Sequence, residues 1–145
     1  MILHGLDKHR DKGLLILRIG IGICFILHGW PKISTPDKWA WLGSQLPMVD
    51  GGTFASIMGF MAAFAEFGGG IMLLLGLFTR PACFLMLNTM IVATYMHVSK
   101  GYSFMKYSHA LEAGILFLSL LFIGPGAYSL DDKFAGKSAG PESER

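Results

Sequence analysis

The chain has 145 residues, of which 52% are hydrophobic and only 15% are charged, and its mean hydropathy is +0.51. This length fits one domain, and the composition is typical of an integral membrane protein that contacts the lipid bilayer. The formal net charge is only +2 and no basic run occurs, which argues against a nucleic-acid-binding protein.

Four apolar runs predict four membrane-spanning helices, because about 20 mostly apolar residues are enough to cross the hydrocarbon core of a bilayer. The predicted spans cover residues 13–30, 54–78, 81–98 and 108–123. Residues 31–53 form a polar and aromatic loop, and the turn at residues 79–81 is so short that the second and third helices must be adjacent and antiparallel. We therefore expect an all-α, integral membrane four-helix bundle in residues 1–131 and a mobile polar tail in residues 132–145.

Four spans place both chain termini on one side of the membrane, and Lys and Arg are enriched in cytoplasmic loops. Seven such residues fall on the side of the termini: Lys8, Arg10, Lys12, Arg80, Lys133, Lys137 and Arg145. Four fall on the other side: Lys32, Lys38, Lys100 and Lys106. We therefore expect both termini to be cytoplasmic.

The second span has one charged residue, Glu66, near its middle. A carboxylate at the centre of a membrane costs about 3 kcal/mol or more unless it faces a partner, a cavity or water. At helical spacing, Gly59 and Gly69 share the face of Glu66, whereas Phe60 and Phe64 share another face. Small residues let neighbouring helices approach closely, so we expect Glu66 to face the protein interior.

Counting about 1.5 Å per residue along each helix brings ionisable side chains of all four helices into the outer half of the bundle. Four of them share one layer: Glu66, Glu112, His28 and His109. His97 comes out slightly nearer to the outer surface. Asn88 is nine residues from His97, which puts the two on opposite sides of their helix, so one of them must point away from the site.

Arg18, on the cytoplasmic side of this layer, is the only permanently charged side chain within the predicted spans. It is offset from Glu66 by about 12 Å along the helix axis, more than a short contact allows. A carboxyl group in a low-dielectric layer is neutral unless a cation stands close. We therefore expect at least one of Glu66 and Glu112 to be protonated at neutral pH.

Three short motifs follow one another along the chain: His28-Gly29-Trp30-Pro31-Lys32, then Glu66-Phe67-Gly68-Gly69 with Leu75-Gly76-Leu77-Phe78-Thr79-Arg80, then Gly124-Pro125-Gly126-Ala127-Tyr128-Ser129-Leu130-Asp131. From about residue 13 to residue 131, the chain resembles the DoxX family of small bacterial membrane proteins. The resemblance implies a four-helix protein of the bacterial inner (plasma) membrane. Some relatives are similar to the small subunit of a thiosulfate:quinone oxidoreductase, and others are associated with redox complexes.

The leading hypothesis is a redox-linked subunit with a polar intramembrane site for a quinone or a partner oxidoreductase. A quinone headgroup needs hydrogen-bond donors for two carbonyl oxygens and a proton route on reduction. The sequence has no haem motif, flavin fingerprint or Cys-x-x-Cys pair, so electrons would come from the partner. The candidate binding residues are Glu66, Glu112, His28, His109 and Arg18.

Two alternatives stay open. One is a metal site, because imidazole and carboxylate ligands suit zinc, iron or copper and four-helix bundles build such sites. Its candidate ligands are His28, Glu66, His97, His109 and Glu112. The other is a structural scaffold in which the buried charges pair with each other. In each case the chain could also form a homo-oligomer.

Overall fold

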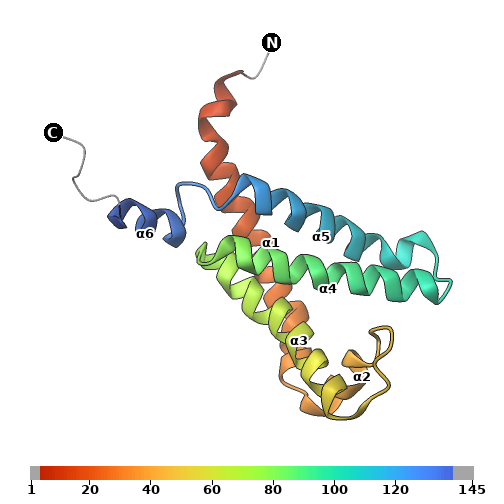
Figure 1. Ribbon diagram of the computed structural model, residues 1–145. Coiled ribbons are helices and arrows are strands. Elements are labelled where there is room, and N and C mark those ends of the chain that lie inside the picture. The colour runs from red at the N-terminus through yellow and green to blue at the C-terminus, as the bar shows by residue number, and fades with distance from the viewer. Residues whose placement is uncertain (1–3, 139–145) are drawn as a thin grey trace.

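A computed structural model describes residues 4–138, and every regular element in that range is helical (Figure 1). In chain order the elements are η1 (His4–His9), α1 (Arg10–Ile33), η2 (Pro36–Lys38), α2 (Trp39–Gly43), α3 (Gly52–Leu75), α4 (Thr79–Ser99), α5 (Phe104–Ile123) and α6 (Leu130–Ser138). The predicted all-α fold is therefore confirmed.

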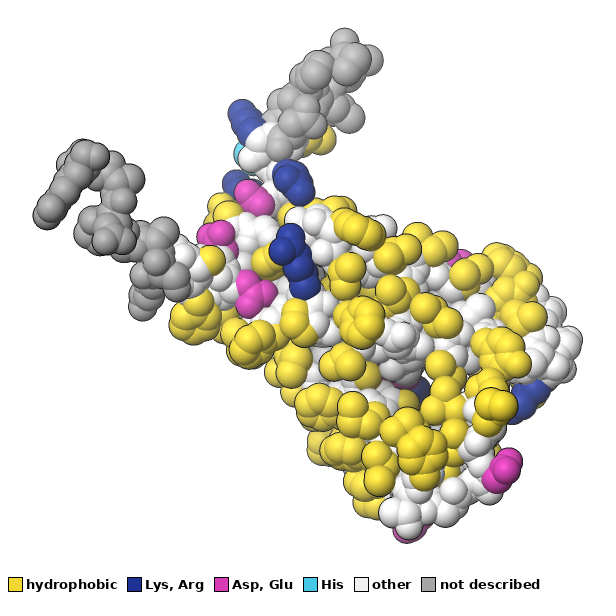
Figure 2. Space-filling model, in the orientation of Figure 1, with side chains coloured by type: hydrophobic (Ala, Val, Ile, Leu, Met, Phe, Trp, Pro, Cys, Tyr) yellow, Lys and Arg dark blue, Asp and Glu magenta, His cyan; other side chains and the backbone are white. Residues whose placement is uncertain are grey.

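Four of these helices, α1, α3, α4 and α5, are long and apolar enough to cross a membrane. They correspond to the four predicted spans. Figure 2 shows hydrophobic side chains over the middle of one face, while most charged side chains gather towards its two ends. Such a surface suits lipid along the middle and water at both ends.

The first helix is longer than predicted, because Pro31 lies inside α1 and does not end it. A proline this close to a helix C-terminus removes only one backbone donor, and the carbonyl groups of the last turn find other partners. The Ser34 N–H donates to the Trp30 carbonyl at 3.0 Å, and the Trp39 indole N–H donates to the Lys32 carbonyl at 2.9 Å. Lys32 therefore belongs to a membrane helix and not to a loop.

The four long helices form two closely packed pairs, α1 with α3 and α4 with α5. Gly22 and Gly70 let α1 and α3 meet, since a Cβ atom on either glycine would lie 2.9 Å from a backbone oxygen of the other. The Phe25 ring packs edge-on against Phe117, with centroids 4.9 Å apart, and this contact joins the two pairs. The protein core is small because lipid covers the outer faces of the helices.

The α3 and α4 helices are adjacent, as predicted, and a turn at residues 76–78 joins them. Figure 1 shows that they diverge away from this turn, which opens a wedge between the two helix pairs. The short helix α2 lies on α3 beside the wedge. The contact is so close that a Cβ atom at Gly59 would lie 1.8 Å from the Trp39 carbonyl oxygen.

The segment after α5 closes the other end of the helix pairs. The Asp131 carboxylate accepts hydrogen bonds from the backbone N–H groups of Phe78 (2.7 Å) and Thr79 (2.8 Å), which ties α6 to the start of α4. The predicted polar tail thus begins as a helix, and residues 139–145 lie outside the described residues. The Ala127 N–H donates to the Asp11 carboxylate at 3.2 Å, so the start of α1 and the end of α5 lie at the same end of the helix bundle. That this end is cytoplasmic stays a prediction.

Candidate functional site

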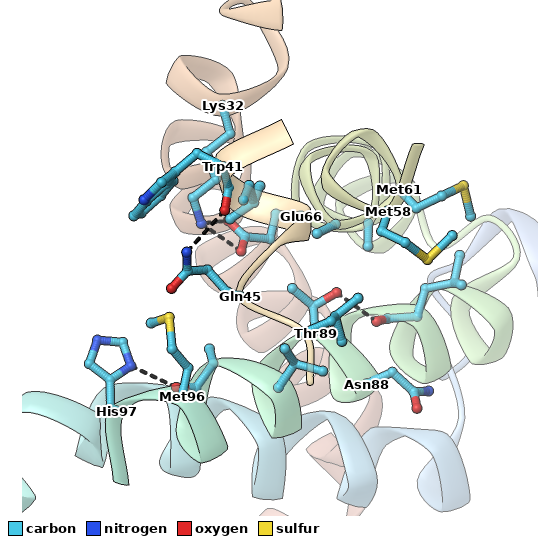
Figure 3. A pocket seen from close by; sticks show the side chains of 17 residues that line it. Lys32, Trp41, Gln45, Met58, Met61, Glu66, Asn88, Thr89, Met96 and His97 are labelled. Atoms are coloured by element: carbon cyan, nitrogen blue, oxygen red, sulfur yellow. Dashed lines mark hydrogen bonds and ion pairs between the residues drawn. The ribbon is translucent and has the colours of Figure 1, made fainter. Parts of the chain in front are cut away.

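A cavity of about 450 Å³ lies between α3 and α4, bordered by the last turn of α1 and by the α2 segment (Figure 3). Most of its lining is apolar, including Met58, Met61, Met96 and Trp41. Its polar side chains are Lys32, Gln45, Glu66, Asn88, Thr89 and His97. Small-molecule sites in proteins have volumes of roughly 300 to 1,000 Å³ and a similar balance of apolar and polar groups.

Glu66 and Lys32 form an ion pair at the wall of this cavity (Figure 3). The Lys32 ammonium nitrogen lies 2.6 Å from one carboxylate oxygen of Glu66 and 2.5 Å from the other. The Glu66 side chain is 5% exposed and that of Lys32 is 38% exposed. The prediction that Glu66 faces the protein interior is confirmed, but the premise that no cation reaches it is wrong.

Lys32 was not among the predicted site residues, because the first span was predicted to end before Pro31. Lys32 follows His28 by one helical turn, and a carboxylate inside a membrane needs a cation. A continued helix would therefore have put Lys32 within reach of Glu66, since the long lysine side chain can extend towards the bilayer.

The four other polar side chains of the cavity are already hydrogen-bonded within the chain. Asn88 and Thr89 donate to carbonyls of their own helix, at Phe84 (2.7 Å) and Leu85 (3.1 Å). The Gln45 side-chain oxygen accepts a hydrogen bond from Lys100 at 2.8 Å, which links the α2 segment to the loop after α4. His97 Nδ1 lies 2.6 Å from the Ala93 carbonyl oxygen, which can only accept, so Nδ1 carries the proton of that contact. In the neutral ring, Nε2 of His97 is then an acceptor.

Asn88 and His97 both line the cavity and lie towards its opposite ends (Figure 3). The Asn88 side chain is exposed and donates to the Phe84 carbonyl of its own helix at 2.7 Å, so the expectation that one of the two points away from the site stays a prediction. The cavity follows α4 from Leu85 to His97, a distance of about 18 Å along the helix axis. Over that length, side chains on both flanks of α4 reach the border of the cavity.

The remaining predicted site residues lie elsewhere. His28 on α1 and His109 on α5 are exposed, and their rings stack with centroids 5.3 Å apart. Glu112 is exposed on α5, and within residues 4–138 it has no hydrogen bond or ion pair. Arg18 is fully buried and donates to the Tyr128 carbonyl at the far end of α1, about 21 Å from Lys32 by helix rise.

The predicted layer of Glu66, Glu112, His28 and His109, with His97 near it, thus separates into two sites, and Arg18 lies far from both. Glu66 and His97 border the cavity, while His28, His109 and Glu112 occupy the face of α1 and α5. Nowhere in the described part of the chain do three His, Cys, Asp or Glu side chains converge as metal ligands would.

Comparison with known proteins supports the resemblance noted above. The DoxX family model matches residues 13–98. An uncharacterized protein of Haemophilus influenzae is 37% identical over 142 residues, which cover 93% of this chain and 100% of the relative. The inner membrane protein YqjF of Escherichia coli is 35% identical over 132 residues, which cover 87% of this chain and 95% of YqjF.

A second Escherichia coli protein, the inner membrane protein YphA, is 32% identical over 130 residues, which cover 81% of this chain and 87% of YphA. No solved structure matches. The match in sequence, the four apolar helices and the inner-membrane relatives agree with one another, and the chain is an inner membrane protein that belongs to the DoxX family.

Proposed function

We propose that the cavity between α3 and α4 binds a quinone from the bilayer, and that the protein acts as a membrane subunit of a redox-linked complex. The observation that carries this proposal is the Lys32–Glu66 ion pair at the wall of a mainly apolar cavity of about 450 Å³. A quinone has a flat apolar ring with polar carbonyl oxygens, so it needs an apolar cavity with a few fixed polar groups.

The polar groups of the cavity suit both redox states of such a ligand. The lysine ammonium has three N–H donors, and the two oxygens of Glu66 occupy two of them. The third can donate to a quinone carbonyl oxygen. His97 Nε2, the acceptor nitrogen of the neutral ring, can accept a hydrogen bond from a quinol hydroxyl.

Reduction of a quinone to a quinol takes up two electrons and two protons. The Lys32 ammonium can give one proton to the quinone. Water, which reaches Lys32 because its side chain is 38% exposed, can supply the second proton through the neutral lysine or the Glu66 carboxylate. The electrons must come from a partner oxidoreductase, because the chain has no haem, flavin or Cys-x-x-Cys motif.

This proposal keeps Glu66 as the central residue and adds Lys32 and His97. It leaves out His28, His109, Glu112 and Arg18, which do not line the cavity. The lipid-like character of the ligand also agrees with the site's position, because α3 and α4 both cross the membrane and diverge at the cavity.

Binding can be measured on the full chain in lipid nanodiscs by titration with a short-chain ubiquinone, with tryptophan fluorescence as the signal. Trp41 lines the cavity, so we expect saturable quenching that Trp41→Phe largely removes. Lys32→Met should raise the dissociation constant of the quinone about tenfold, because the variant loses one charge-assisted hydrogen bond to it. His109→Ala, outside the cavity, is the control. Quenching that does not saturate would refute the proposal. Equal changes in the dissociation constant for Lys32→Met and His109→Ala would also refute it.

A further inference from the structure

A second polar surface of the protein has no role in the proposed quinone site. It lies on the outer side of α1 and α5 and consists of Cys24, His28, His109 and Glu112, all of them exposed. We call it the histidine face. Glu112 is eight residues into the 20-residue helix α5, about 12 Å from its start, which places it near the middle of the membrane.

The histidine face is a poor surface for lipid contact. A carboxyl group exposed to hydrocarbon costs about 3 kcal/mol or more, and Glu112 has no hydrogen bond or ion pair with residues 4–138 to reduce that cost. The two imidazole rings beside it are also exposed, although they stack on each other at 5.3 Å. The chain alone therefore leaves three ionisable groups uncovered at membrane depth.

The chemistry of this face is complementary to itself. His28 Nδ1 lies 2.8 Å from the Cys24 carbonyl oxygen, so it is the protonated nitrogen and leaves Nε2 of the neutral ring as an acceptor. A carboxyl group and an imidazole that share one proton form a neutral pair whichever atom holds the proton. Glu112 supplies one half of such a pair and the histidines the other half, but within the described chain they are not bonded to each other.

We propose that a second copy of this chain covers the histidine face, with Glu112 of each copy paired to His28 or His109 of the other. A two-fold axis places the same patch of both copies in contact, so each acid meets a base twice. An unrelated partner would have to bring its own matching groups, whereas this face already carries both halves. Gly20, two helical turns before His28 on α1, leaves room for the approach, since a Cβ atom there would meet nothing within 4 Å.

Fluorescence energy transfer between donor-labelled and acceptor-labelled copies of the full chain in vesicles tests this proposal. We expect transfer for the wild type that persists when the vesicles are diluted with lipid. Two variants are compared with the wild type, Glu112→Gln and the double variant His28→Ala/His109→Ala. Each variant by itself lacks both glutamate–histidine pairs of the dimer. Its association constant should fall at least about tenfold, which corresponds to 1.4 kcal/mol.

A mixture of the two variants gives the sharpest result. Glu112→Gln keeps both histidines and the double histidine variant keeps Glu112, so a mixed dimer regains one of the two pairs. The energy transfer of the mixture should therefore lie clearly above that of either variant alone. Asp37→Asn makes the same chemical change at an exposed residue outside α1, α5 and the cavity, and should associate as the wild type does.

All the residues substituted on the histidine face are exposed, so the variants should fold, which circular dichroism can check. Three results would overturn the proposal: wild-type transfer that falls in proportion to lipid dilution, Glu112→Gln association equal to that of the wild type, or a mixture no better than its components. Glu112-dependent co-purification with a different membrane protein, together with a monomeric wild type, would also overturn it.

Discussion

The two membrane-embedded glutamates of this protein lie in opposite surroundings. Glu66 on α3 is buried between helices and holds Lys32 with both carboxylate oxygens, whereas Glu112 on α5 is exposed and has no partner within residues 4–138. Both sit in apolar helices, and their positions along those helices predict one common depth. The difference shows that depth makes a charge costly, while the packing of the helices decides whether the chain itself offsets that cost.

The largest effect should come from Lys32→Leu, which leaves Glu66 buried without its cation. We expect a loss of about 2 to 4 kcal/mol in unfolding free energy, somewhat less than for a fully buried pair because Lys32 is 38% exposed. The denaturation midpoint of the protein in detergent measures the loss. Lys38→Leu, at an exposed lysine of the short helix η2 that follows α1, is the control.

The double variant Lys32→Leu/Glu66→Leu should recover most of that stability, because replacing a whole buried ion pair by apolar residues is often neutral or stabilising. If the single change costs less than about 0.5 kcal/mol, or if the double variant is less stable than the single one, the ion pair is not what distinguishes the two glutamates.

Glu66→Gln should have an intermediate effect of about 1 to 2 kcal/mol. The lysine left behind is partly exposed and can turn towards water, which the buried carboxylate of the first variant cannot do. The same denaturation measurement should therefore rank Glu66→Gln between Lys32→Leu and the wild type. The reverse order would mean that Lys32 is the more buried partner.

A smaller effect is expected from Lys100→Ala, which removes the hydrogen bond to Gln45 between the α2 segment and the loop after α4. Exposed polar contacts of this kind contribute only about 0.5 kcal/mol to stability. Because Gln45 lines the cavity, the exchange rate of a short-chain ubiquinone should rise while the denaturation midpoint hardly moves. Lys38→Ala should change neither quantity.

The smallest effect on the stability of a single chain should come from Glu112→Gln. It removes a carboxyl group that has no partner in the described chain, so the unfolding free energy of the monomer should change by no more than about 0.5 kcal/mol. It is the same substitution as Glu66→Gln, and equal losses in the two variants would contradict the contrast between the two glutamates.

Much of the fold could be predicted from the sequence, since four apolar runs identify four spans and the small residues around Glu66 turn that side chain inwards. Other features depend on quantities that a sequence pattern does not contain. Helix rise gives the depth of His28, Glu66 and Glu112 but not the direction in which each helix faces its neighbours. The divergence of α3 from α4, which creates the cavity, depends on a crossing angle that only the packed structure defines.

Lys32 was missed for a local reason. A proline inside an apolar run usually signals the end of a helix, yet Pro31 sits so near the C-terminus of α1 that it removes a single donor. The indole of Trp39 then binds the Lys32 carbonyl, an interaction between residues seven positions apart that no periodicity indicates. The motifs of the family resemblance, in contrast, include both members of the ion pair at the cavity wall, Lys32 and Glu66.

The most direct test of a quinone site at Glu66 is photolabelling of the full chain in nanodiscs with an azido-ubiquinone, followed by mass spectrometry of the labelled peptides. We predict that the label falls within residues 58–66 of α3 and 85–97 of α4. Excess short-chain ubiquinone should remove this label, and Lys32→Leu should reduce it. Label concentrated on α1 and α5 around His28, His109 and Glu112, or label that excess ubiquinone does not reduce, would contradict it.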